Sequence, residues 1–293
     1  MKDNIITGET PVTKIYSNEN RNTLLKNKIY CKTKAEYISD ITNIPYQYII
    51  NRIKNWYLIN NQYYYFKPMK DAHHFINEFI GEKISEYFDL DTAHYQVAEL
   101  YDQYNNTKYG VISKNFCKPE YSYKSLADYI AESDELSFFS NNLSIIDNIK
   151  CICKSDEEYY KLRNKLKAMF IRNYYNVSSD GNSYNIMLKK DNKGIQLAEL
   201  YDYEIAYLDY GRISYQLTDI GLFDISNEHI QKLLRSDDEF QMLLNKLMKA
   251  DINNFIQQVE SDQKIIIPQD QKQHYQKYEN QVKKLVLDYE LIK

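Results

Sequence analysis

The stretch SDGNSYNIML, from Ser179 to Leu188, decides how this chain organises its candidate site. It is a polar loop that offers Asp180 and, five positions later, Asn185, and it ends in an apolar run. The turn-forming residues 191–194 separate this run from a second one, which leads to Asp202. Two apolar runs around such a turn predict a β-hairpin. The hairpin would bring Asp202 back beside Asn185, so we expect three oxygen-bearing side chains at one end of it.

A lysine and a glutamate far upstream form a second pair of interest. The Asn60-Asn61 turn between two aromatic-rich runs predicts a hairpin over 57–66, and Lys67 follows at its end. Apolar residues at helical spacing predict a helix over 75–88, with Glu78 in its first turns. The two residues therefore lie at a strand end and on the next helix. Taken alone, each is more often a solvated surface charge.

The remaining pattern divides the chain into a strand-rich and a helix-rich part. Two more strands are expected over 95–101 and 109–115, and the segment 116–119 that follows is interpreted as a hinge. Apart from the hairpin after Asn185, only helices are expected beyond the hinge. They are predicted over 124–132, 143–153, 155–175 (opened by a Ser155-x-x-Glu158 capping box), 228–234, 237–258 (with a Ser236-x-x-Glu239 capping box) and 271–291. We therefore predict an α+β fold, with a small mixed-sheet lobe over 1–116 and a mostly helical lobe over 117–293.

Composition excludes some classes of partner and compartment. Lys+Arg 37 against Asp+Glu 41 leaves a formal charge of -4, which argues against a dedicated nucleic-acid or anionic-membrane binder. No apolar run approaches the length needed to cross a membrane, and the N-terminus lacks a signal-peptide core. The four cysteines show no metal-ligand spacing, which is typical of thiols in a reducing compartment. We therefore expect a cytoplasmic protein.

The segment 33–66 supports a different interpretation. Up to Lys70 the chain carries 11 lysines and arginines against 5 acidic residues, a local charge of +6. Helical patterns over 33–41 and 46–56, followed by the predicted hairpin, are also typical of a winged helix-turn-helix. Arg52 and Lys54 would then meet phosphates. A DNA-binding regulator acting through residues 33–66 is therefore one alternative.

Four short motifs together resemble the HipA-like kinases, a bacterial branch of the protein-kinase fold. They are Phe-Lys-Pro at 66–68, Asn-Glu at 77–78, Asp180-x-x-x-x-Asn185, and Leu-Tyr-Asp at 200–202, and the similarity covers about residues 60–290. The resemblance implies a bilobal protein-kinase-like fold and an ATP- and Mg-dependent kinase that phosphorylates Ser or Thr of a protein substrate. Many members act as toxins that an antitoxin protein controls. The implied roles are nucleotide binding by Lys67, Glu78, Phe116, Asn185 and Asp202, orientation of the attacking hydroxyl by Asp180, and Mg²⁺ binding by Asn185 and Asp202.

Two departures from the family pattern favour another alternative. The family loop usually has Arg-His after the catalytic aspartate, whereas this chain has Gly181 and Asn182. No glycine-rich loop precedes Lys67, because the only earlier glycine is Gly8. A pseudokinase, or a nucleotide-binding regulatory module on the same fold, is therefore the second alternative.

Overall fold

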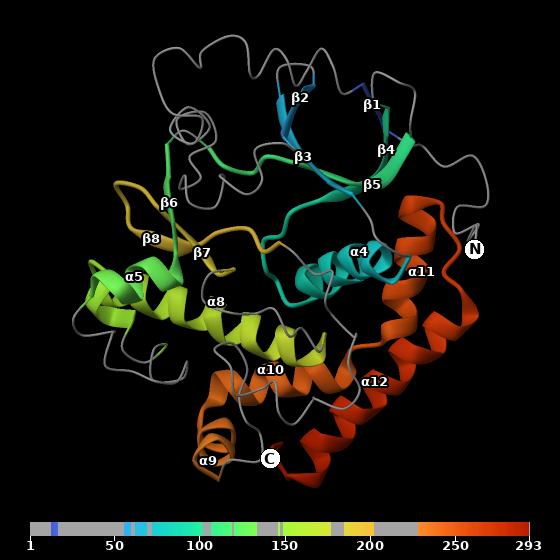
Figure 1. Cartoon of the computed structure of the whole chain (residues 1–293). Helices are drawn as coiled ribbons and strands as arrows, with labels where there is room; N and C mark the ends of the chain where they lie inside the picture. Colours follow the sequence, from blue (N-terminus) through green and yellow to red (C-terminus); the bar gives the residue numbers. More distant parts are fainter. Residues whose placement is uncertain are drawn as a thin grey trace.

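The computed structural model describes residues 13–16, 56–59, 62–68, 72–101, 107–118, 120–133, 146, 149–176, 185–201 and 228–292. In Figure 1 a strand-rich part lies above a helical part, and a second, smaller sheet lies on one flank. This arrangement confirms the predicted α+β fold class. The division into lobes at 116/117 stays a prediction.

Five described strands form one mixed sheet in the order β1-β4-β5-β3-β2. β1 runs parallel to β4, and the other neighbours are antiparallel. The hairpin predicted over 57–66 is present, and so are the two strands predicted over 95–101 and 109–115. The strands are β1 (Thr13–Tyr16), β2 (Trp56–Ile59), β3 (Gln62–Pro68), β4 (Tyr95–Tyr101) and β5 (Thr107–Lys114).

The hairpin that could have formed the wing of a DNA-binding motif belongs to this sheet. Trp56 was expected to end a helix, but it begins β2 and pairs opposite Tyr65. β3 pairs on its other side with β5. The rest of the two helices predicted between 33 and 56 lies outside the described residues.

Helix α4 (Ala72–Tyr87) connects the sheet to the helical part. Its buried residues recur at helical spacing, as Ile76, Ile80 and Ile84 do, and this confirms the helix expected over 75–88. In Figure 1 it lies between the large sheet and α11 (Ile252–Gln263). Its buried face joins the main core cluster, which also contains Val97 and Val111 of the sheet. The core is therefore continuous from β4 and β5 through α4 to the C-terminal helices.

A second sheet contains the expected hairpin after Asn185 and one further strand, β6, that was not expected beyond the hinge. It has the order β6-β7-β8, with β6 (Ser122–Ser125), β7 (Met187–Lys190) and β8 (Ile195–Leu197). Lys124, expected to begin a helix, lies in β6 opposite Leu188. The helix α5 (Leu126–Glu132) starts only after Ser125, whose side chain forms a capping box with Asp128. The cap fixes the boundary two residues later than the apolar pattern indicated.

The C-terminal helices differ from the prediction mainly at their boundaries. The long helix expected over 237–258 is two helices, because Asp251 caps a new one after α10 ends. The cap of α10 is Asp237, which accepts the N–H of Phe240, in place of the expected Ser236. Of the helix expected over 143–153, the described residues show a 3-10 turn at Ile149–Ile152 and one helical residue at 146. The helices are α8 (Asp156–Tyr175), α9 (Glu228–Ser236), α10 (Asp238–Lys249) and α12 (Gln269–Asp288), besides α11.

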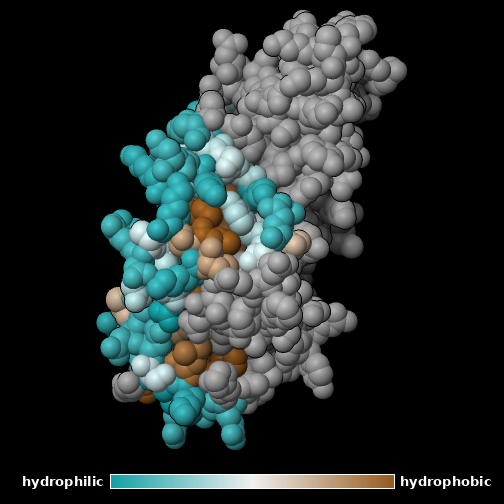
Figure 2. Space-filling model, turned by 90° about the vertical axis from the view of Figure 1, so that its left-hand side faces the viewer, coloured by the Kyte–Doolittle hydropathy of each residue, from teal (hydrophilic) through white to brown (hydrophobic). Residues whose placement is uncertain are grey.

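The described part of the surface in Figure 2 is mostly polar. Hydrophilic residues cover the described part of that face, interrupted by two apolar patches. Among the described helices, none combines the length and the apolar character that a membrane crossing requires.

Candidate functional site

Lys67 and Glu78 form an ion pair in the interior of the molecule. The Lys67 ammonium donates to Oε1 of Glu78 at 2.6 Å. Glu78 has no exposed side-chain surface, whereas 14% of the Lys67 side chain remains exposed. A carboxylate is stable in such a place only when charge and hydrogen bonds compensate it. The strand end and the helix are thus brought together as their spacing indicated.

Gly110 is a site residue that the sequence did not reveal. It lies on β5 opposite Pro68 of β3, next to the position of Lys67. A β carbon at Gly110 would lie 2.2 Å from the carbonyl oxygen of Lys67 and 2.8 Å from Cζ of Phe66. Any larger residue would therefore push β3 away from β5. This role depends on how β3 and β5 pair, and the amino-acid sequence alone does not specify that pairing.

Helix α4 is held in place from two further sides. Asn77, next to Glu78, accepts a hydrogen bond from the Tyr275 hydroxyl of α12 at 2.7 Å. Arg172 of α8 is buried and donates to Ser85 Oγ at 2.9 Å and to the carbonyl oxygen of Gly81 at 3.0 Å. Buried polar groups need such partners, so each contact fixes the helix rotation as well as its position. The sequence did not mark Arg172 or Tyr275 as site residues.

The predicted hairpin after Asn185 is present as β7 and β8. The Asp191 side chain accepts the N–H groups of Lys193 (2.8 Å) and Gly194 (3.0 Å), which closes the turn. Gly194 has φ 148, a conformation open mainly to glycine. Asn185 is half-buried just before β7, and the hairpin carries the chain back to Leu200.

Leu200 attaches the end of this hairpin to the segment between α4 and β4. Its N–H donates to the carbonyl oxygen of Asp91 at 2.9 Å, and its own carbonyl accepts the N–H of Ala93 at 2.8 Å. The chain two residues before Asp202 is therefore hydrogen-bonded to the loop that leads into β4.

The hinge lies against the chain next to Asp202. Phe116 contacts Tyr201 with ring centroids 6.0 Å apart and Tyr123 at 6.5 Å. The Lys118 N–H donates to the Tyr123 hydroxyl at 3.1 Å, which orders the hinge backbone. Burial raises the pKa of the Cys117 thiol, so this cysteine stays protonated at neutral pH. The result is an apolar, aromatic wall between the two sheets.

Several predicted site residues lie outside the described residues. Asp180, Asp202, Gly181 and Asn182 belong to this group, so their expected positions stay predictions. Of the described ones, Lys67 and Glu78 are in contact, Phe116 packs against Tyr201, and Asn185 lies just before β7.

A separate hollow of about 530 Å³ contains none of the predicted site residues. It lies between the turn at 88–91, α8, β8 and α10, and its lining combines apolar residues such as Leu162, Leu197 and Leu243 with lysines and acidic residues.

The comparisons with known proteins identify the fold. No family model matches the sequence, and no curated protein matches it. The crystal structure of the Helicobacter pylori proinflammatory kinase CtkA is similar, with a TM-score of 0.56 and 15% identity over 80% of this chain and 91% of that chain. A chain of the Shewanella oneidensis MR-1 toxin–antitoxin complex of HipA, HipB and operator DNA is similar, with a TM-score of 0.51 and 12% identity. That match covers 81% of this chain and 63% of the Shewanella chain, less than two thirds of its length.

Both similar structures match over most of this chain, although at low sequence identity. This chain therefore has the α+β fold of the HipA-like kinases.

Proposed function

We propose that this chain is an ATP- and Mg-dependent Ser/Thr protein kinase of the HipA-like type. The observation that carries the proposal is the ion pair between Lys67 on β3 and the fully buried Glu78 on α4, 2.6 Å apart. In kinases a lysine on this strand binds the α- and β-phosphates, and a helical glutamate fixes it. A chain with a kinase-like fold that also places this pair in its interior has the part of the site that recognises nucleotide phosphates.

The geometry supports different tasks for Lys67 and Glu78. Glu78 is enclosed by the protein, so its carboxylate serves to hold the ammonium in one place. The Lys67 side chain is 14% exposed, and its ammonium carries the positive charge that a phosphate would meet. A triphosphate would therefore meet a positive charge whose position is set before binding, which lowers the cost of ordering it.

The roles of Asp180, Asn185 and Asp202 are those that the resemblance to the HipA-like kinases implies. Asp180 would orient the attacking hydroxyl of a Ser or Thr substrate, where positioning matters more than basicity. Asn185 and Asp202 offer amide and carboxylate oxygens, the donor chemistry that Mg²⁺ prefers, and the hairpin returns the chain toward Asn185. Bound Mg²⁺ would neutralise charge on the transferred phosphoryl group. The aromatic wall at Phe116 would cover the base.

The proposal extends to a toxin-like role with a regulator protein as partner. The Shewanella structure that resembles this chain contains HipA together with HipB and operator DNA. By analogy, a separate regulator would bind this chain and control it. Co-purification with the product of a neighbouring reading frame is the direct measurement.

Two substitutions test the proposal and its alternative. Asp202→Ala should abolish binding of the metal–nucleotide complex, because it removes the carboxylate ligand, and calorimetry with ATP and Mg²⁺ measures this. Asp180→Ala should keep nucleotide binding but lose radiolabel transfer to the chain or to lysate proteins. Equal ATP affinity in wild type and Asp202→Ala would refute the metal-site assignment.

The pseudokinase alternative rests on Gly181 and Asn182, which stand where the family has Arg-His. It makes a distinct prediction for the same experiment: the wild type binds nucleotide but transfers no label. A chain that binds no nucleotide at all would contradict both versions.

A further inference from the structure

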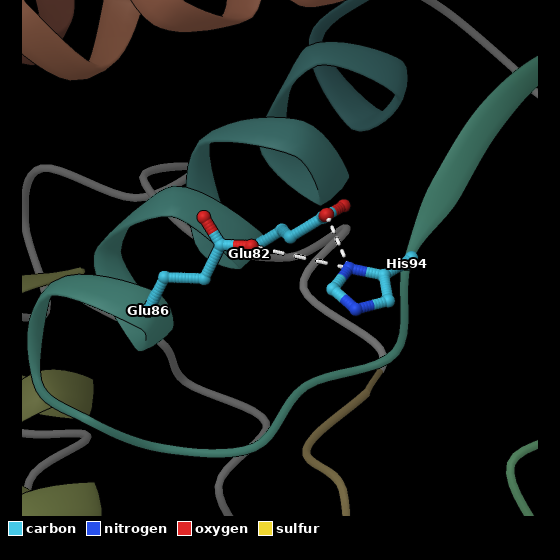
Figure 3. Close-up of side chains that lie close together, drawn as sticks. All are labelled: Glu82, Glu86 and His94. Atoms are coloured by element: carbon cyan, nitrogen blue, oxygen red, sulfur yellow. Dashed lines mark hydrogen bonds and ion pairs between the residues drawn. The ribbon is translucent and has the colours of Figure 1, made fainter.

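Three potential metal ligands meet on the surface beside α4. Glu82 and Glu86 lie one turn apart on this helix and therefore share a face, and His94 lies just before β4. His94 Nδ1 is 2.8 Å from Oε1 of Glu82 and 3.9 Å from Oε1 of Glu86. One ligand atom from each of the three lies within 4.8 Å of the others. Figure 3 shows both carboxylates and the imidazole edge turned toward one another.

Glu82, the central carboxylate of this cluster, has little positive charge near it. The Glu82 side chain is 9% exposed, and it accepts the Tyr95 N–H at 3.0 Å besides contacting His94. Among the described residues no lysine or arginine pairs with it. A buried carboxylate in this situation gains from a bound cation.

The neighbouring lysine leaves the ligand atoms accessible. Lys83 Nζ pairs with the other oxygen of Glu86, Oε2, at 3.3 Å and with Asp262 at 2.8 Å. It therefore neutralises the outer side of Glu86 while Oε1 faces His94. The His94 side chain is 74% exposed and that of Glu86 40%, so both can adjust, and solvent reaches the cluster.

We propose that Glu82, Glu86 and His94 bind a divalent transition-metal ion of the Zn²⁺ class. Ligand bonds of about 2.0–2.2 Å require ligand atoms roughly 3 Å apart, which the Glu82–His94 pair already satisfies. The Glu86–His94 pair reaches it by a small rotation of two exposed side chains. An imidazole together with carboxylates favours Zn²⁺ or a similar ion over Mg²⁺, which prefers oxygen ligands alone. Water fills the open positions.

The site would join α4 to the hairpin that leads to Asp202. His94 follows Ala93, whose N–H donates to the carbonyl oxygen of Leu200 at 2.8 Å. Helix α4 carries Glu78, the partner of Lys67. A metal ion bound by α4 and by His94 would therefore hold α4, which carries Glu78, against the segment that is hydrogen-bonded to Leu200. This link does not require that the chain transfer phosphate.

Metal titration of the full chain without a purification tag and without nucleotide tests the proposal. The metal-free protein should take up one equivalent of Co²⁺, with visible absorption bands of a protein-bound ion, and one equivalent of Zn²⁺ by calorimetry. His94→Ala and Glu86→Gln should each weaken binding by about tenfold or more, since each removes a ligand. Both side chains are exposed, so circular dichroism of the metal-free variants should match the wild type.

Two control variants separate this site from adventitious binding. His274→Ala removes a histidine on α12, and Glu157→Gln removes an exposed carboxylate on α8, and both should bind like the wild type. No uptake of Co²⁺ or Zn²⁺ by the wild type would overturn the proposal, and so would unchanged affinity in His94→Ala. Because nucleotide is absent, neither result bears on the kinase assignment.

Discussion

Gly110 helps to set the position of Lys67, because the absence of a side chain lets the two strands approach closely. β5 approaches β3 so closely that a β carbon at Gly110 would overlap the Lys67 carbonyl oxygen. Gly110→Ala should therefore separate the two strands, lower the free energy of unfolding by about 2–3 kcal/mol and weaken ATP binding. Ser113→Ala on the same strand adds no atoms and serves as the control in denaturant unfolding. A Gly110→Ala protein as stable as this control would contradict the packing argument.

At the residue scale, the sequence revealed the charged partners and missed the residues that position them. Lys67 and Glu78 could be paired because a strand end and the next helix were recognisable from hydrophobic periodicity. Arg172 and Gly110 could not, because their roles depend on contacts across long stretches of chain, Arg172 with Gly81 and Gly110 with Lys67. Such contacts follow from tertiary packing and leave no local pattern.

At the element scale, Glu158 fastens the β7–β8 hairpin to the start of α8. Its carboxylate accepts the Lys154 N–H at 2.6 Å and the Ile195 N–H, and it lies against Gly194. Glu158→Ala should lower the free energy of unfolding by about 2 kcal/mol, because two backbone N–H groups lose a charged acceptor. Glu157→Ala, the neighbouring exposed carboxylate, should leave denaturant unfolding unchanged. Equal losses in the two variants would show that the hairpin contact is unimportant.

Glu158 also shows why elements were easier to predict than their boundaries. Ser155 and Glu158 were expected to form a capping box, and Ser155 does accept the Glu158 N–H. The Glu158 carboxylate, however, turns to Lys154 and to the hairpin, which the sequence of the helix cannot specify. β6 was missed for a similar reason, since its four residues become a strand by pairing with β7.

At the scale of the whole molecule, one buried ion pair links stability to pH. Lys167 of α8 is 1% exposed and lies 2.5 Å from Asp237, the cap of α10. Burial raises the pKa of Asp237, but hydrogen bonds from Lys167 and the Phe240 N–H, with the charges of Lys167 and Arg163, outweigh it and hold the pKa below 3.8. A carboxyl with a lowered pKa contributes stability above its unfolded-state pKa, and this contribution is lost as pH falls through the folded-state value.

Asp237→Asn should keep the helix cap but lose the charge. We expect a loss of about 2 kcal/mol in the free energy of unfolding at pH 7, where the variant leaves Lys167 without its carboxylate. The difference from wild type should shrink as pH falls below 3.8. Urea unfolding at several pH values measures it, and a difference independent of pH would rule out the electrostatic explanation.

Much of the architecture was predictable because the strands of the large sheet precede the hinge and most described helices follow it, with recognisable periods. The resemblance to the HipA-like kinases then added the arrangement of the parts, and the similar solved structures agree with it. Asp180 and Asp202, the residues on which transfer would depend, remain predictions from the motif.

The contacts of α4 have a consequence for how this chain could be controlled. Four polar side chains of the helix are each committed to a different element: Asn77 to α12, Glu78 to β3, Glu82 to the start of β4 and Ser85 to α8. Sliding the helix by one residue would turn it by about 100° and break all four contacts together. An on–off mechanism that swings this helix would thus face a steep energetic barrier.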